Sequence, residues 1–202
     1  GAGVLNGVWF TPVFPFDLDG DGSDEIYFVN NTDSVHILSY NHLRLTALNS
    51  RDGESLGEWP WKRVVHGTNS HTFRNFILGG YCQGEPVLVT AQGTYGRMGL
   101  QAWNPVMQNR WDLIIEEDDP GARGSHMCPV LDINADGIDE ILWGERCISL
   151  DSGEQLFVAD RDVYNGHSDV IQPTLKRYAN PYYDLIRRIT ATGYNIVELG
   201  GL

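Results

Sequence analysis

The sequence predicts an all-β protein, a β-propeller of about four blades built from short antiparallel strands. The first observation is a pair of nine-residue acidic loops, residues 17–25 and 132–140, each followed by a short strand-like run instead of a helix. The second is an internal repeat after each loop: an apolar strand, an Asp-Gly or Ser-Gly turn, a Glu and another apolar strand. This repeat is a β-hairpin pattern, whereas helical periodicity is weak along the whole chain.

Each acidic loop matches the first nine positions of a calcium loop of the EF-hand type, written DxDxDGxxE, with Asn134 at the third position of the second loop. Glycine at the sixth position accepts the positive φ of a tight turn. Ca²⁺ takes about six to eight oxygen ligands, so we expect Ca²⁺ as the cofactor, in a structural more than a catalytic role. The alternative is a pair of acidic turns without metal. The expected ligands are Asp17, Asp19, Asp21, the Ser23 carbonyl and Glu25 in the first loop, and Asp132, Asn134, Asp136, the Ile138 carbonyl and Glu140 in the second.

Four units along the chain define the expected blades of one domain spanning residues 1–202. We place them at about residues 8–57, 73–115, 127–160 and 167–202, and the second carries no acidic loop. Propellers close with about four to eight blades, and an open sheet edge would be exposed. We therefore expect further blades from outside this chain.

Composition limits which kinds of binding partner and which cellular compartment we expect for this protein. The net charge of −13 argues against a nucleic-acid partner and against an anionic membrane surface. No apolar run is long enough to cross a bilayer. Three cysteines, Cys82, Cys128 and Cys147, lack zinc-site or disulfide spacing, and we expect buried free thiols. Because external Ca²⁺ would saturate weak loops of this kind, we expect a secreted, extracellular protein.

Polar side chains between the expected strands form the candidate catalytic site. His126 precedes the second acidic loop and His167 stands at the start of the last unit, so both lie where the chain enters a blade and could be neighbours. Two other loops carry His71, Tyr95 and Arg97. A His–Tyr–Arg cluster beside Ca²⁺ could remove a proton α to a carboxylate and neutralise that carboxylate. The alternative for each histidine is an ordinary turn or surface position.

Several segments, taken in order and spacing, resemble the family 11 polysaccharide lyases, the rhamnogalacturonan lyases. They are RDGE at 51–54, RNFILGG at 74–80, VLVTAQGTY at 87–95, LQAWN at 100–104, GSH at 124–126 and GHSD at 166–169. The resemblance implies a calcium-rich propeller in which His126 and His167 match the two active-site histidines. It also implies β-elimination: the C5 proton of a uronic acid is removed, the bond to O4 breaks, and Ca²⁺ binds the uronate carboxylate and acidifies that proton.

Two functions remain open on the sequence. The first is an extracellular lyase that cleaves a uronic-acid polymer of the rhamnogalacturonan or pectin type, with this acidic polysaccharide as substrate. The second is a non-catalytic, calcium-stabilised module like the FG-GAP repeats, which would bind a glycan or a protein. The histidine pair favours the lyase, because an adhesion repeat does not need it.

Overall fold

A computed structural model describes residues 12–31, 43–61, 74–93, 97–116, 118–119, 128–144 and 146–158. These residues form twelve strands and no helix, so the all-β class is confirmed. In this part of the chain there is accordingly no helix long and apolar enough to span a membrane. Four catalytic candidates, His71, Tyr95, His126 and His167, lie outside the described residues, as does the unit expected at 167–202.

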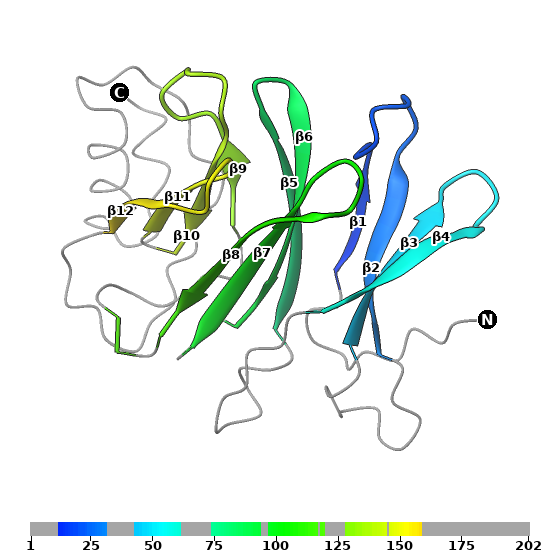
Figure 1. Cartoon of the computed structure of the whole chain (residues 1–202), viewed down its shortest axis with the longest axis horizontal. Helices are drawn as coiled ribbons and strands as arrows, with labels where there is room; N and C mark the ends of the chain where they lie inside the picture. Colours follow the sequence, from blue (N-terminus) through cyan, green and yellow to red (C-terminus); the bar gives the residue numbers. More distant parts are fainter. Residues whose placement is uncertain are drawn as a thin grey trace, which may run out of the picture.

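The strands form three four-stranded antiparallel sheets, and each sheet is an up-and-down meander (Figure 1). The first sheet contains β1 (Val13–Phe16), β2 (Glu25–Asn31), β3 (Leu43–Asn49) and β4 (Ser55–Pro60). The middle sheet contains β5 (Asn75–Cys82), β6 (Glu85–Gln92), β7 (Met98–Trp103) and β8 (Asn109–Ile115). The third sheet contains β9 (Val130–Leu131), β10 (Glu140–Trp143), β11 (Arg146–Ser149) and β12 (Gln155–Val158).

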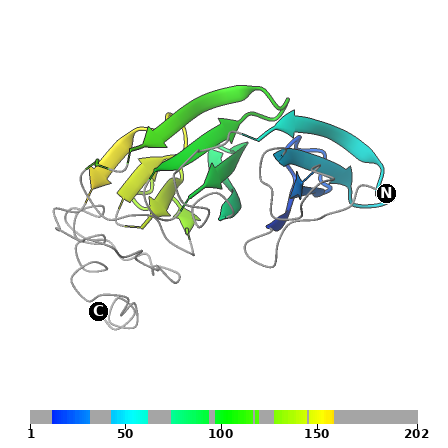
Figure 2. The ribbon, with the colours of Figure 1, turned by 90° about the horizontal axis from the view of Figure 1, so that it is seen from below.

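The sheets follow one another along an arc, with β4 and β8 on its outer side (Figure 2). Their first strands are neighbours, since β5 contacts both β1 and β9. One apolar core fills the space between the first and middle sheets and contains Leu45, Leu88 and Trp103. A second core lies between the middle and third sheets and contains Val89 and Ile148. Burial of apolar area between the sheets therefore stabilises their side-by-side arrangement.

Two adjacent glycines in β5 let the three sheets approach closely. Successive residues of a strand point to opposite faces, so Gly79 faces the first sheet and Gly80 faces the third. A Cβ atom on Gly79 would lie 2.9 Å from a ring carbon of Phe14. On Gly80 it would lie 2.6 Å from Val130 Cγ1 and 2.7 Å from Leu150 Cδ2. A larger residue at either position would push a neighbouring sheet away.

The turns predicted around Gly53 and Gly153 join β3 to β4 and β11 to β12. The Gly53 N–H donates to the Asn49 carbonyl at 2.9 Å, and the Gly153 N–H donates to the Ser149 carbonyl at the same distance. Both glycines have positive φ, +74° and +73°, which favours glycine there. The two turns thus share one conformation, as their shared sequence pattern indicates.

The third sheet is also held to the outer strand of the middle sheet. The Trp111 indole N–H of β8 donates to the Leu150 carbonyl at 2.8 Å, and the Trp111 ring lies directly under Gly153. Beside it, the Arg110 guanidinium pairs with the Asp151 carboxylate, and its Nε–H donates to the backbone carbonyl of Asp151 at 3.1 Å. The β11–β12 turn is therefore a contact between sheets and not a free surface loop.

Candidate functional site

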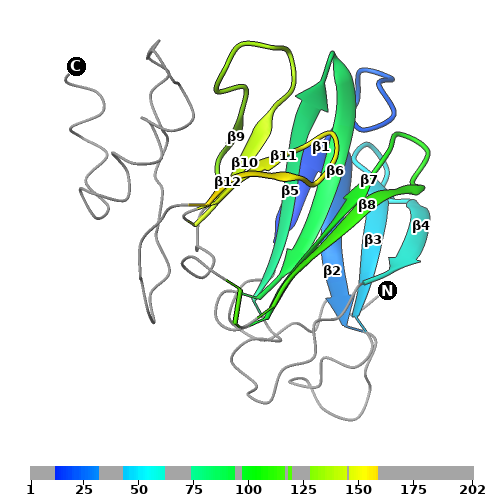
Figure 3. The ribbon, with the colours of Figure 1, turned by 60° about the vertical axis from the view of Figure 1, so that its left-hand side comes forward.

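The two acidic loops lie at the same end of the sheets. One joins β1 to β2 and the other joins β9 to β10, and the β5–β6 turn stands between them (Figure 3). Phe16, the last residue of β1, has its ring centroid 5.8 Å from that of Tyr81 in β5. On the other side, Gln83 in the β5–β6 turn hydrogen-bonds to the second loop. This end of the molecule therefore carries both predicted metal loops.

The two loops share four internal hydrogen bonds at equivalent positions. In each loop, the glycine N–H at position six donates to the carboxylate at position one. The N–H at position two donates to the side chain at position nine, the N–H at position five to the side chain at position three, and the N–H at position seven to the side chain at position five. In the first loop the bonds are Gly22 to Asp17 (2.9 Å), Leu18 to Glu25 (3.1 Å), Asp21 to Asp19 (3.0 Å) and Ser23 to Asp21 (2.8 Å). In the second they are Gly137 to Asp132 (2.8 Å), Ile133 to Glu140 (2.9 Å), Asp136 to Asn134 (2.9 Å) and Ile138 to Asp136 (2.8 Å).

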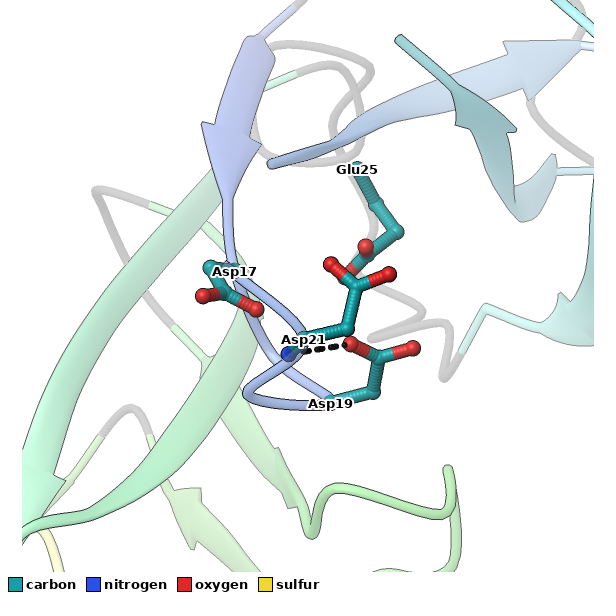
Figure 4. A group of neighbouring side chains, drawn as sticks. All are labelled: Asp17, Asp19, Asp21 and Glu25. Atoms are coloured by element: carbon teal, nitrogen blue, oxygen red, sulfur yellow. Dashed lines mark hydrogen bonds between the residues drawn. The ribbon is translucent and has the colours of Figure 1, made fainter. Parts of the chain in front are cut away.

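In the first loop four carboxylates converge. Asp17, Asp19, Asp21 and Glu25 each offer one oxygen, and these four oxygens all lie within 4.8 Å of one another (Figure 4). Carboxylates this close repel one another unless a cation or protons intervene. The Asp17 Oδ1 atom is moreover buried and has no hydrogen-bond partner, which leaves it available to a metal ion. The donor set is all oxygen, as a hard divalent cation requires.

Glu25 connects this cluster to the core. The residue is 8% exposed, and its Oε2 atom accepts hydrogen bonds from the Leu18 N–H at 3.1 Å and from the Tyr27 hydroxyl at 3.2 Å. Burial raises the pKa of the Glu25 carboxyl, and the nearby Asp19 adds to the rise, whereas the Leu18 hydrogen bond opposes it. Burial next to Glu25 also raises the pKa of the Tyr27 hydroxyl. Ser23, expected to ligate through its carbonyl, accepts a hydrogen bond from Arg51 at its hydroxyl.

The second loop is arranged differently around its third position. The Asn134 amide donates to Asp136 Oδ2 at 2.8 Å, so an amide–carboxylate hydrogen bond stands where the first loop has two carboxylates. Among the described residues, only the first loop brings three or more acidic, histidine or cysteine ligand atoms within 4.8 Å of one another. Glu140 is buried, like Glu25. Ligation by Asp132, Asn134, Asp136, the Ile138 carbonyl and Glu140 stays a prediction.

Contacts with the middle sheet hold the second loop in place. The Gln83 backbone N–H donates to the Gly137 carbonyl and its side-chain amide to the Asp136 carbonyl, both at 2.7 Å. The Tyr81 N–H donates to Asp139 Oδ2, also at 2.7 Å. Neither Asp139 nor Gln83 is among the residues expected from the sequence to ligate the ion. The sequence signal that could have found Gln83 is the Gln83-Gly84 pair after β5, a two-residue hairpin turn.

Arg97 lies at the opposite end of the middle sheet. It precedes β7 and contacts Glu116 Oε1 through Nη2 at 3.0 Å and Nε at 3.1 Å, with 37% of its side chain exposed. Nearby, the buried Gln92 amide donates to Asn75 Oδ1 at 3.0 Å. At about 3.3 Å per residue, β5 separates Asn75 from Cys82 by roughly 23 Å. The structure thus places Arg97 away from both acidic loops, while the roles of His71, Tyr95, His126 and His167 stay predictions.

The three cysteines are free and buried, as the sequence predicts. Burial raises the pKa of the Cys82 thiol to about 11 and raises that of Cys147 as well. Neither thiol is therefore an activated thiolate nucleophile near neutral pH.

Comparisons with known proteins point to one group of enzymes. No family model matches the chain. The chain is 27% identical over 224 residues to the rhamnogalacturonan exolyase YesX of Bacillus subtilis (strain 168). The alignment covers 86% of this chain and 36% of that protein. The sequence resemblance to rhamnogalacturonan lyases is thereby confirmed, at a distance and over about a third of their length.

Solved structures show the same fold. The rhamnogalacturonan lyase YesW superposes with a TM-score of 0.68 at 23% identity, over 83% of this chain and 34% of YesW. The exotype lyase YesX superposes with a TM-score of 0.63 at 24% identity, over 76% of this chain and 32% of YesX. The Bacillus licheniformis rhamnogalacturonan lyase PL11 gives 0.59 at 26% identity, over 73% and 31%.

Proposed function

We propose that this chain, a distant relative of the family 11 rhamnogalacturonan lyases, is part of a secreted polysaccharide lyase. Its substrate would be a uronic-acid polymer of the rhamnogalacturonan or pectin type. The observation that carries the proposal is the alignment with the exolyase YesX, which extends over 86% of this chain. The common fold with three lyase structures supports it independently of individual residues.

The proposed architecture is a β-propeller of which the three sheets are successive blades. Three features support this: each sheet is a four-stranded meander, the first strands β1, β5 and β9 are neighbours, and the sheets follow an arc. A propeller blade has this design, with its first strand nearest the axis. A closed ring needs more blades than three, and we assign one to residues 167–202 and further ones to chain outside this sequence.

The proposed cofactor is Ca²⁺, held in the first loop by Asp17, Asp19, Asp21, the Ser23 carbonyl and Glu25. The converging oxygens and the buried Asp17 Oδ1 support this assignment. The second loop repeats the hydrogen bonds of the first, and on that ground we assign it the same role. Calcium in these loops would neutralise their carboxylates and fix the turns between strands.

The proposed reaction is β-elimination at a uronate. A base removes the C5 proton, the electron pair forms the C4–C5 double bond, and the bond from C4 to O4 breaks, with a proton passing to the departing oxygen. We assign the base and a substrate-holding role to His126 and His167, with His71 and Tyr95 in adjoining loops. We assign Arg97 to neutralise a substrate carboxylate, since 37% of its side chain is exposed, and the substrate would share this guanidinium with Glu116. Both calcium loops lie at the other end of the sheets, so we assign their ions a structural role and not a place at the reacting uronate.

The test is to incubate the protein with rhamnogalacturonan, pectin and algal uronate polymers and to follow the ultraviolet absorbance of unsaturated uronate. We expect absorbance to rise with a pectic polymer. The rise should be abolished in His126→Ala and His167→Ala but not in the control Val106→Ala, a residue that is 70% exposed. Absence of product with every polymer, together with calcium-dependent retention on a glycan, would replace the lyase with a binding module of the FG-GAP kind.

A further inference from the structure

The buried hydroxyl of Tyr27 acts on a predicted metal ligand. Tyr27 follows Glu25 by two residues in β2, and residues two apart in a strand share one face. The Tyr27 hydroxyl donates to Glu25 Oε2 at 3.2 Å, and the Leu18 N–H donates to the same oxygen at 3.1 Å. Two donors thus engage Oε2, which leaves Oε1 as the oxygen that would ligate an ion.

The position of Tyr27 is itself fixed by packing. The residue is 3% exposed and belongs to the core between the first and middle sheets, together with Val29 and Leu45. A densely packed ring has little freedom to move, so its hydroxyl has a defined place relative to β2. The orientation of the Glu25 carboxylate is consequently determined by the core and not by the exposed part of the loop.

The second loop supplies an internal comparison. Leu142 stands at the position equivalent to Tyr27, two residues after Glu140, and it is fully buried. Leucine cannot donate a hydrogen bond, whereas the Ile133 N–H still donates to Glu140 Oε2, as Leu18 does to Glu25. The phenol is therefore a feature of the first loop alone and is not needed to form the backbone turn.

We propose that Tyr27 is a positioning residue for the cation of the first loop, where its hydroxyl orients Glu25 for ligation through Oε1. This inference rests on the calcium site proposed above. Groups that hydrogen-bond to metal ligands typically contribute about 10- to 100-fold to metal affinity. Tyr27→Phe removes the hydroxyl and keeps the packed ring, so the first loop should lose Ca²⁺ affinity by about that factor.

The experiment titrates chelator-treated protein with Ca²⁺ and follows binding by calorimetry and the melting temperature. Glu25→Gln, which removes a ligand oxygen charge, identifies the binding transition that belongs to the first loop. Tyr27→Phe should shift the midpoint of that transition to higher Ca²⁺ concentration. The control Tyr81→Phe also removes a tyrosine hydroxyl at this end of the sheets, from a residue that is 48% exposed, and should leave the midpoint unchanged.

A purely structural role for Tyr27 would lower the melting temperature equally with and without Ca²⁺ and would leave the midpoint in place, and that result would overturn the proposal. Tyr27→Leu, which copies the residue of the second loop, should show the same weakened affinity and provides a second variant. If wild-type protein shows no Glu25-dependent Ca²⁺ transition, the proposed calcium site itself is wrong. The two failures are therefore distinguishable.

Discussion

Replacing Gly80 with alanine tests whether the three sheets interlock at β5. The added methyl would lie 2.6 Å from Val130 Cγ1, 2.7 Å from Leu150 Cδ2 and 2.8 Å from Asp139 Oδ2. Overpacking of a core costs about 1–3 kcal/mol, and three simultaneous close contacts place this site in the upper half of that range. Alanine in place of glycine recovers about 0.4–1 kcal/mol of unfolded-state entropy. We therefore expect the free energy of unfolding to fall by about 1–2.5 kcal/mol.

The assay is urea unfolding of Gly80→Ala, Val130→Ala and the double variant. Val130→Ala removes the closest contacting methyl, so the cost of Gly80→Ala should be smaller in that background, and the difference measures the coupling between the two residues. Gly79→Ala should cost less than Gly80→Ala, because its added methyl would meet ring carbons of Phe14 at 2.9 Å and of Phe16 at 3.0 Å, which are longer contacts than those at Gly80. Wild-type stability of Gly80→Ala, or an equal cost in both backgrounds, would refute the interlocked packing.

Three further outcomes are expected. Chelation should lower the melting temperature, because an ion at a hundredfold excess over its Kd stabilises the folded state by about 2.7 kcal/mol, and unchanged melting would contradict the calcium assignment. Trp111→Phe leaves the buried Leu150 carbonyl without its donor and should cost about 1–3 kcal/mol in urea unfolding, more than the control Trp59→Phe. Cys82 and Cys147 should resist alkylation in native protein at mildly alkaline pH and react after denaturation, since burial raises the pKa of both thiols; rapid native labelling would disprove their burial.

The features that could be predicted from sequence are those decided within a few residues. Both acidic loops close through hydrogen bonds that span at most seven residues, from side chains to N–H groups of the same loop. The turns at Gly53 and Gly153 need only a glycine at positive φ, which the Asp-Gly and Ser-Gly pairs provide. Alternating short strands between such turns then leave an all-β fold as the consistent solution.

Contacts between distant segments could not be predicted in this way. Gln83 holds the second loop across more than fifty residues of sequence, and neither partner carries a pattern that names the other. Gly79 and Gly80 look like an ordinary flexible pair until neighbouring sheets close in on each side. The link from Tyr27 to Glu25 is short in sequence but depends on the burial of the ring. In each case packing between sheets decides the role, and a single sequence does not show that packing.

The predicted metal loops and the predicted catalytic residues belong to opposite ends of the sheets. In a meander, successive connections alternate between the two ends of a sheet, and both acidic loops lie at the end where β5 turns into β6. In contrast, β6 ends and β7 begins at the end that carries Arg97 and Gln92. Tyr95 falls in the sequence between β6 and β7, and His126 falls in the sequence between β8 and β9. The strand ends that flank these two intervals lie at this second end of the sheets.

This separation gives two independent perturbations. His126→Ala should abolish product formation while keeping the full calcium-dependent rise in melting temperature, because no carboxylate of either loop is altered. Asp19→Asn should reduce that rise through loss of one of four converging charges, while residual activity at low temperature keeps the wild-type KM. A changed KM in Asp19→Asn, or a lost calcium response in His126→Ala, would show that ion and substrate share one site. The expected result would give the ions a structural role: they hold the sheets in place, and the reaction at the other end depends on that arrangement.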